Sequence, residues 1–258
     1  MQFAAIVPKP LRRAMAMLVD YVLPPRCSGC GTIVAADHIF CLDCWRSLDF
    51  LGGPACAVCA EPLALALDVE TRCGQCLADP PPFDRMRAAV AYGRIARSLA
   101  LKLKYGGRPG AAMTMARHMR RAAAGAIEDA LVAPVPLHRR RLWSRGYNQA
   151  ALIARALVRQ QGGELAVDLI DRRRATPALR GLGRRARARA VEGAFTLAPG
   201  WRTRVRGRRV LLVDDVYTTG ATVKACARVL KRAGASEVAI VCWARVVRDG
   251  EPEDDPPR

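Results

Sequence analysis

The chain has 258 residues, of which 51% are hydrophobic and 25% are charged, as in an ordinary globular protein and unlike a disordered or fibrous one. No apolar run reaches the roughly 18 residues of a membrane span, and no clear signal peptide is present, so we expect a cytoplasmic protein without membrane insertion. With 42 Lys and Arg residues against 23 Asp and Glu, the net charge of +19 favours polyanionic ligands such as nucleic acid, nucleotides or pyrophosphate.

The N-terminal segment carries a short amphipathic pattern. From Leu11 to Leu23 the apolar residues recur at helical spacing, and Pro24 and Pro25 then stop a helix from continuing. We therefore assign residues 1–23 to an N-terminal helix.

Eight of the ten cysteines form four Cys-x-x-Cys pairs. Two residues between cysteines let both sulfur atoms of a tight turn face one tetrahedral ion. The eight residues are Cys27, Cys30, Cys41, Cys44, Cys56, Cys59, Cys73 and Cys76. Four pairs supply two sites of four thiolates, so we expect two structural Zn²⁺ ions in a double zinc ribbon over residues 24–80.

Two other interpretations of these cysteines are weaker. Disulfides suit a secreted protein, and a redox Cys-x-x-Cys normally occurs once, beside the start of a helix. The spacing leaves the pairing open, because the first pair could share an ion with the second pair or, in a cross-braced arrangement, with the third. Cys226 and Cys242 have no partner at ligand spacing and are expected to be buried apolar residues.

A proline-rich stretch at 79–84 marks a domain boundary, and apolar strands alternate with amphipathic helices after it. This alternation predicts an α/β fold with a parallel sheet flanked by helices. We expect strands at 86–92, 131–136, 208–213 and 237–244, and helices at 94–105, 111–124, 148–161 and 221–233. We assign 84–247 to this domain and 248–258 to a disordered tail.

The stretch VLLVDDVYTTGAT, residues 210–222, places Asp214 and Asp215 at the end of an apolar strand. Ligands of open parallel sheets bind beyond the carboxyl ends of the strands. Gly220 lets the backbone turn, and the N–H groups of such a turn and of the helix start bind phosphate. A capped helix is the simpler alternative, but one cap residue would be enough for it. Carboxylates that accept hydrogen bonds from sugar hydroxyls, next to a turn that binds phosphate, suit a ribose 5-phosphate ligand.

Two arginine-rich stretches supply further candidates for binding anions, because a guanidinium group forms bidentate hydrogen bonds with phosphate oxygens. The first contains Arg139, Arg140, Arg141 and Arg145. For any one of these, a solvated basic loop is the alternative. The second has eight arginines between Arg172 and Arg189 and little apolar content, so we expect a flexible loop, which could equally lie along a nucleic-acid backbone. Lys104 and Tyr105 either border the pocket or form an exposed helix end.

The stretch 210–222 resembles the signature with which type I phosphoribosyltransferases bind phosphoribosyl pyrophosphate (PRPP). The remainder resembles the ComF family, in which a double zinc ribbon precedes a transferase domain. The resemblance rests on LPPRCSGCG, PPFDRMRAAVAY, LKLKYGGR, VPLHRRRLWSRGYNQA and GLGRRARARAVEGAF, which cover nearly the whole chain. It implies the type I phosphoribosyltransferase fold.

The resemblance also implies roles for individual residues. Asp214 and Asp215 would be the catalytic residues, and their carboxylates would bind the ribose 2- and 3-hydroxyls. The loop that binds the 5-phosphate would comprise Val216, Tyr217, Thr218, Thr219, Gly220, Ala221 and Thr222. The arginines of the first stretch would bind pyrophosphate, and a flexible loop that closes over PRPP would contain Arg184, Arg185 and Arg187.

The implied activity is transfer of ribose 5-phosphate from PRPP, bound with Mg²⁺, to an acceptor that the sequence does not identify, with release of pyrophosphate. No general base stands out, so catalysis would depend on positioning and on stabilising the charge that grows on pyrophosphate. ComF-family proteins are associated with natural competence, which implies single-stranded DNA and competence or recombination proteins as partners. The alternatives are a single-stranded DNA-binding competence protein that keeps a PRPP pocket without turnover, and a structural adaptor.

Overall fold

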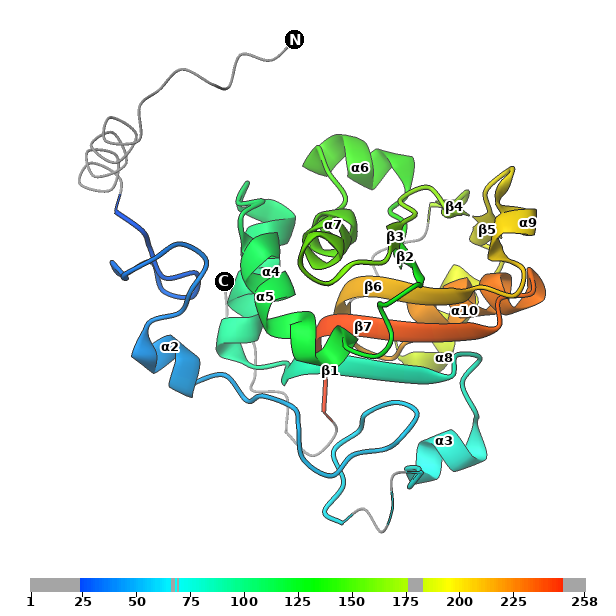
Figure 1. Ribbon diagram of the computed structural model, residues 1–258, viewed down its shortest axis with the longest axis horizontal. Helices are drawn as coiled ribbons and strands as arrows, with labels where there is room; N and C mark the ends of the chain where they lie inside the picture. The colour runs from blue at the N-terminus through cyan, green and yellow to red at the C-terminus, as the bar shows by residue number, and fades with distance from the viewer. Residues whose placement is uncertain (1–23, 66–67, 69, 176–182, 248–258) are drawn as a thin grey trace.

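The computed structural model describes residues 24–65, 68, 70–175 and 183–247. Its centre is a parallel five-stranded sheet in the order β1-β7-β6-β2-β3 (Figure 1). The strands are β1 (Arg85–Ala91), β2 (Leu131–Pro134), β3 (Glu164–Leu165), β6 (Arg209–Tyr217) and β7 (Glu237–Arg245). This sheet confirms the predicted fold class. The expected N-terminal helix and C-terminal tail lie outside the described residues.

Helices cover both faces of the sheet (Figure 1). On one face lie α4 (Arg94–Tyr105), α5 (Ala111–Ala123) and α7 (Gln149–Gln161). On the other lies α10 (Ala221–Arg232), together with a small antiparallel sheet. That sheet consists of β4 (Ile170–Arg172) and β5 (Phe195–Leu197), and the remaining helices are α2 (Leu42–Arg46), α3 (Gly74–Ala78), α6 (Arg139–Arg145), α8 (Arg184–Val191) and α9 (Trp201–Val205). None of the described helices is long and apolar enough to span a membrane.

Side chains of the central strands alternate between the two faces, as a pleated strand requires. On β6, Leu211 and Val213 contact the core under α5 and α7, while Val210 and Leu212 contact the core under α10. Both faces are buried, which explains the unbroken apolar runs in the sequence. Trp243 on β7 is fully buried, and its indole Nε1 donates a hydrogen bond of 3.1 Å to the carbonyl oxygen of Ala96.

The elements differ from the sequence prediction mainly around the ligand-binding edge. Strand β6 does not end at Val213 but continues to Tyr217, because these residues keep pairing with β7. Helix α6 forms where a basic loop was expected, and the His138 side chain caps it by accepting from the backbone N–H of Arg140 at 3.3 Å. Helix α8 likewise forms inside the stretch expected to be a flexible loop.

The two cysteine-rich modules attach to the sheet domain at separate places. Cys27 and Cys44 of the first module belong to the core beside α4 and α5. The second module is joined to β1 through the N–H of Met86, which donates to the carbonyl oxygen of Val58 at 2.7 Å. Both modules therefore pack on the domain along the β1 side of the sheet (Figure 1).

A buried ion pair strengthens the second attachment. Arg245, the last residue of β7, is 2% exposed, and Glu61 is 6% exposed. The Arg245 guanidinium donates to the Glu61 carboxylate and to the carbonyl oxygen of Cys59. It also lies 5.6 Å from the ring centre of Tyr217. The second cysteine module is thus linked to the end of β6 through one arginine.

We expect Glu61→Gln to lower the free energy of unfolding by about 3 kcal/mol, because it leaves the buried Arg245 charge without its counter-ion. Urea denaturation of the zinc-loaded protein would measure this. Glu70→Gln, at an exposed position of the same module, should change the value by less than about 0.5 kcal/mol. Equal stability of the two variants would contradict the importance of the ion pair.

Candidate functional site

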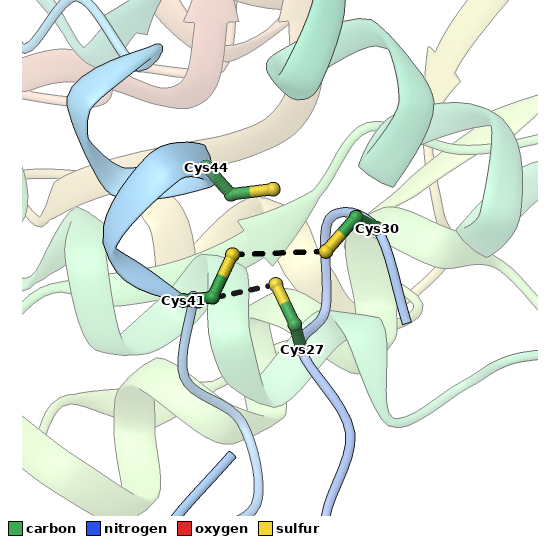
Figure 2. A group of neighbouring side chains, drawn as sticks. All are labelled: Cys27, Cys30, Cys41 and Cys44. Atoms are coloured by element: carbon green, nitrogen blue, oxygen red, sulfur yellow. Dashed lines mark hydrogen bonds between the residues drawn. The ribbon is translucent and has the colours of Figure 1, made fainter. Parts of the chain in front are cut away.

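The structure gathers the eight paired cysteines into two clusters. In each cluster the four sulfur atoms lie within 4.8 Å of one another. The first contains Cys27, Cys30, Cys41 and Cys44 (Figure 2), and the second contains Cys56, Cys59, Cys73 and Cys76. The pairing therefore follows chain order, and the cross-braced alternative is wrong.

Sulfur spacing in both clusters fits a tetrahedral zinc ion. The Cys30 and Cys41 sulfur atoms are 3.6 Å apart, and those of Cys59 and Cys73 are 3.7 Å apart. A tetrahedron with Zn–S bonds of about 2.3 Å has edges of about 3.8 Å, whereas a disulfide bond would be about 2.05 Å long. All eight thiols are free of disulfides. These observations support two structural zinc sites and exclude the disulfide interpretation.

Backbone hydrogen bonds favour the thiolate form of Cys27 in the first cluster. The N–H of Cys41 donates to the Cys27 sulfur at 3.2 Å. Burial opposes ionisation of Cys27, but backbone hydrogen bonds outweigh it and lower its pKa to about 6. A Cβ atom at Gly29 would lie 2.7 Å from the Cys44 sulfur, so only glycine fits between the ligands.

The acidic pair of the PRPP-like stretch lies in the last residues of β6. The Asp215 N–H donates to Asp214 Oδ1, and the Val216 N–H donates to Asp215 Oδ1, each at 2.9 Å. Asp215 is 3% exposed, and its Oδ2 atom lies 2.6 Å from Nζ of Lys104 at the end of α4. Lys104 therefore borders the acidic pair, and this settles the alternative that the sequence left open for it.

The charges of these three groups depend on one another. Burial, followed by the neighbouring Asp215 charge, raises the pKa of Asp214 to about 8. Burial alone would lower the pKa of Lys104, but the charge of Asp215 outweighs it and raises that pKa. Lys104 thus stays protonated and lies against Asp215, while its charge lowers the pKa of Asp214 too little to offset burial. The acidic edge is ready for a ligand that brings hydroxyl donors or a cation.

The turn after the acids has the backbone conformation of an anion-binding turn and borders a shallow hollow. Gly220 has a φ of +72°, and a Cβ atom there would lie 2.5 Å from the hydroxyl of the buried Tyr217. Asp214 and residues 216–223 line a shallow hollow of about 30 Å³ that is open to solvent. Among the described residues, the buried hydroxyl of Thr219 has no hydrogen-bond partner. An orphaned donor in a hollow at a helix start fits an anionic ligand.

One arginine of the second basic stretch reaches this turn. Arg187 on α8 donates from Nη1 to the hydroxyl of Thr218 at 3.1 Å. The side chains of Arg184 and Arg185 lie outside the described part of the chain. Sequence analysis did not single out Arg172, which is 9% exposed and close enough to Asp214 for that charge to affect its pKa.

The other predicted arginines lie on α6. Arg139, Arg140 and Arg141 form its first turn, and Arg145 ends it. Arg145 donates to the hydroxyl of Tyr105 at 3.0 Å, and its guanidinium lies 4.8 Å from the centre of that ring. Since Tyr105 follows Lys104, this contact places the end of α6 beside the acidic edge.

Comparison with known proteins agrees with both halves of this architecture. The double zinc ribbon domain matches residues 18–77, and the phosphoribosyl transferase domain matches residues 146–258. The chain is 34% identical over 199 residues to DNA utilization protein YhgH of Escherichia coli K12, covering 74% of this chain and 84% of that protein. It is 30% identical over 228 residues to Competence protein F of Haemophilus influenzae, covering 85% and 96% respectively. The chain belongs to the ComF family.

This ComF-family protein is also more distantly similar to two solved structures. TT1426 from Thermus thermophilus is 22% identical, with a TM-score of 0.33, over 54% of this chain and 85% of that one. An allosteric regulatory enzyme of purine biosynthesis is also 22% identical, with a TM-score of 0.37, over 55% and 30%. Likenesses of this degree carry no argument about function.

We expect elemental analysis of the purified protein to find two zinc ions per chain. Cys44→Ala should remove one, because three thiolates bind zinc much more weakly than four. Cys226→Ala should keep both, since Cys226 is buried in the core away from either cluster. Loss of zinc from the Cys226 variant, or full zinc in the Cys44 variant, would contradict the assignment.

The raised pKa of Asp214 predicts a pH-dependent stability. The carboxyl is protonated in the folded protein up to about pH 8, whereas its ordinary pKa is 3.8. The unfolded chain therefore releases a proton that the folded chain keeps, and stability falls as the pH rises toward 8. Relative to Asp214→Asn, the wild type should lose about 1 kcal/mol per unit between about pH 6 and pH 8. Urea unfolding measures this, and a constant difference would contradict it.

Proposed function

We propose that this ComF-family protein binds the Mg²⁺ complex of PRPP at the carboxyl end of β6 and transfers its ribose 5-phosphate to an acceptor. The observation that supports this most strongly is the placing of two acids, one compensated by Lys104, directly before a turn with an orphaned hydroxyl. This arrangement separates a site for sugar hydroxyls from a site for a phosphate.

Each half of the site has a distinct task in this proposal. The carboxylates of Asp214 and Asp215 accept hydrogen bonds from the two ribose hydroxyls, and Lys104, 2.6 Å from Asp215 Oδ2, holds the Asp215 side chain in place. Backbone N–H groups and hydroxyls of residues 218–222 donate to the 5-phosphate. Mg²⁺ arrives with the substrate and offsets the charge of its pyrophosphate.

Departure of pyrophosphate leaves positive charge on the sugar, and negative charge grows on the leaving group. The arginines of α6, beside the acidic edge, are suited to stabilise the leaving group. Arg187, which bonds Thr218, connects α8 to the phosphate turn. Closure of the segment that contains α8 would exclude water from the reacting carbon.

The test is calorimetric titration of Mg²⁺ and PRPP into the protein. Replacing both acids, as Asp214→Asn with Asp215→Asn, should weaken binding at least about a hundredfold, because two charge-assisted hydrogen bonds are lost. The matched control is Asp168→Asn with Asp171→Asn, which removes two exposed acids from the same domain. Pyrophosphate release on adding candidate bases reports turnover. If the variant with both Asp214→Asn and Asp215→Asn still binds PRPP tightly, the proposed site is wrong.

A second candidate function is binding of single-stranded DNA, with the PRPP pocket retained as a sensor. The names of the two relatives, with DNA utilization and competence, and the charge of +19 favour it. Two aromatic side chains near the α6 arginines are exposed: Trp143 on α6 is 88% exposed, and Tyr105, which contacts Arg145, is 71% exposed. Exposed aromatic rings among arginines are the usual means of binding single strands.

This second function predicts oligonucleotide binding that weakens steeply with salt. Trp143→Ala should lower the affinity about tenfold, since one base loses its stacking partner. The same variant should bind PRPP as the wild type does. Fluorescence anisotropy with a labelled oligonucleotide measures the effect, and absence of binding at low salt would remove this function.

A further inference from the structure

A second cavity lies beneath the segment that joins the two cysteine modules. This segment, residues 49–57, is called the strap here. Near its start the N–H of Leu51 donates to the carbonyl oxygen of Ala89 at 3.0 Å, and just past its end the Val58 carbonyl accepts from Met86 at 2.7 Å. Between these attachments the strap, β1 and the C-terminal half of α5 border a chamber of about 600 Å³ that is partly open to solvent.

The chamber is separate from the proposed PRPP site. It lies along β1 and reaches Ala239 and Ile240 near the start of β7, whereas the acidic pair lies toward the C-terminal end of β6. The chamber and the hollow at Thr218–Thr222 share no lining residue. A ligand in the chamber would therefore leave the acidic pair free.

The wall of the chamber is positively charged. Arg85, Arg87 and Arg121 line it, whereas Asp49 is the one acid among its lining residues. Glu237 pairs with Arg85 at 3.0 Å, so the charge that faces the chamber comes mainly from the other two. The Arg121 guanidinium reaches the strap and lies 3.5 Å from the position of a Cβ atom on Gly52. Nη1 of Arg87 already donates to the carbonyl oxygens of Ala57 at 2.9 Å and Met86 at 2.8 Å, so Arg121 is the principal cation for an anionic ligand.

An aromatic surface and an unused nitrogen complete the wall. Phe50 is 39% exposed, and its ring centre lies 5.9 Å from that of His118. Among the described residues, the buried Nε2 atom of His118 has no hydrogen-bond partner. The rings of Phe40, Trp45, Phe50 and Trp243 surround His118. Burial, followed by the charge of Arg117, lowers the pKa of His118. An unpartnered Nε2 atom calls for a polar ligand atom.

We infer that the chamber binds a nucleotide unit, with its phosphate at Arg121 and its base against Phe50 and the Nε2 atom of His118. Cations, an aromatic face and one hydrogen-bonding nitrogen in a cavity of 600 Å³ suit a flat base that carries a phosphate. The unit is either a free mononucleotide or one nucleotide of a single strand, because both offer the same chemistry. This inference does not depend on the proposed function.

The test is calorimetric titration of AMP and, separately, of the hexanucleotide (dC)6 into the full chain. Both titrations use protein that carries Asp214→Asn and Asp215→Asn, so that binding at the PRPP site does not contribute. Arg121→Ala should weaken binding about tenfold or more. Arg120→Ala removes the same charge from the neighbouring residue, which does not line the chamber, and should stay within about twofold. His118→Phe keeps the ring packing and removes Nε2, so it should weaken binding as well.

Binding of AMP alone would identify a free nucleotide as the ligand, and binding of the oligonucleotide alone would identify a strand. In both cases the losses with Arg121→Ala and His118→Phe support the chamber. Binding that neither variant weakens, or no binding of either probe, would overturn the inference. None of these outcomes bears on PRPP, because the acidic pair is absent from the protein used.

Discussion

The contact between Lys104 and Asp215 is the interaction on which the site depends. Two adjacent carboxylates in the last residues of a largely buried strand repel each other, and burial raises the energy of both charges. A lysine from α4, 2.6 Å away, offsets one of them. The other carboxyl keeps a raised pKa and gains a full charge only at alkaline pH or with a suitable ligand. The edge that carries the proposed binding site is therefore less stable than an apolar strand end would be.

The cysteine modules extend this arrangement beyond the sheet. Arg245 at the end of β7 bonds Glu61 and the carbonyl of Cys59, a cluster residue, and lies over Tyr217, whose hydroxyl lies against Gly220 in the phosphate turn. A chain of direct contacts therefore runs from the second zinc cluster to the turn. Zinc at this cluster would stabilise the conformation of the turn without contacting a ligand. A structural metal would therefore affect the affinity of the turn for its ligand.

Sequence patterns were informative where the physics is local. Helices α4, α5, α7 and α10 lie within one residue of the expected ranges, and chain spacing indicated both cysteine clusters. The buried pair of Arg245 and Glu61 could not be predicted, because 184 residues separate the partners. The one indication of this pair in the sequence was a charged residue, Arg245, at the end of the apolar run of β7. Helices α6 and α8 were missed because their arginines give no apolar periodicity.

The most direct measurement is a crystal structure of the protein with Mg²⁺ and PRPP. The account predicts density for the ribose hydroxyls within hydrogen-bond distance of Asp214 and Asp215, with the 5-phosphate held by the backbone of residues 218–222. PRPP bound elsewhere, for example with its phosphates in the chamber beside Arg121, would contradict it. So would a sugar bound in the reverse orientation, with its 5-phosphate directed at the acids.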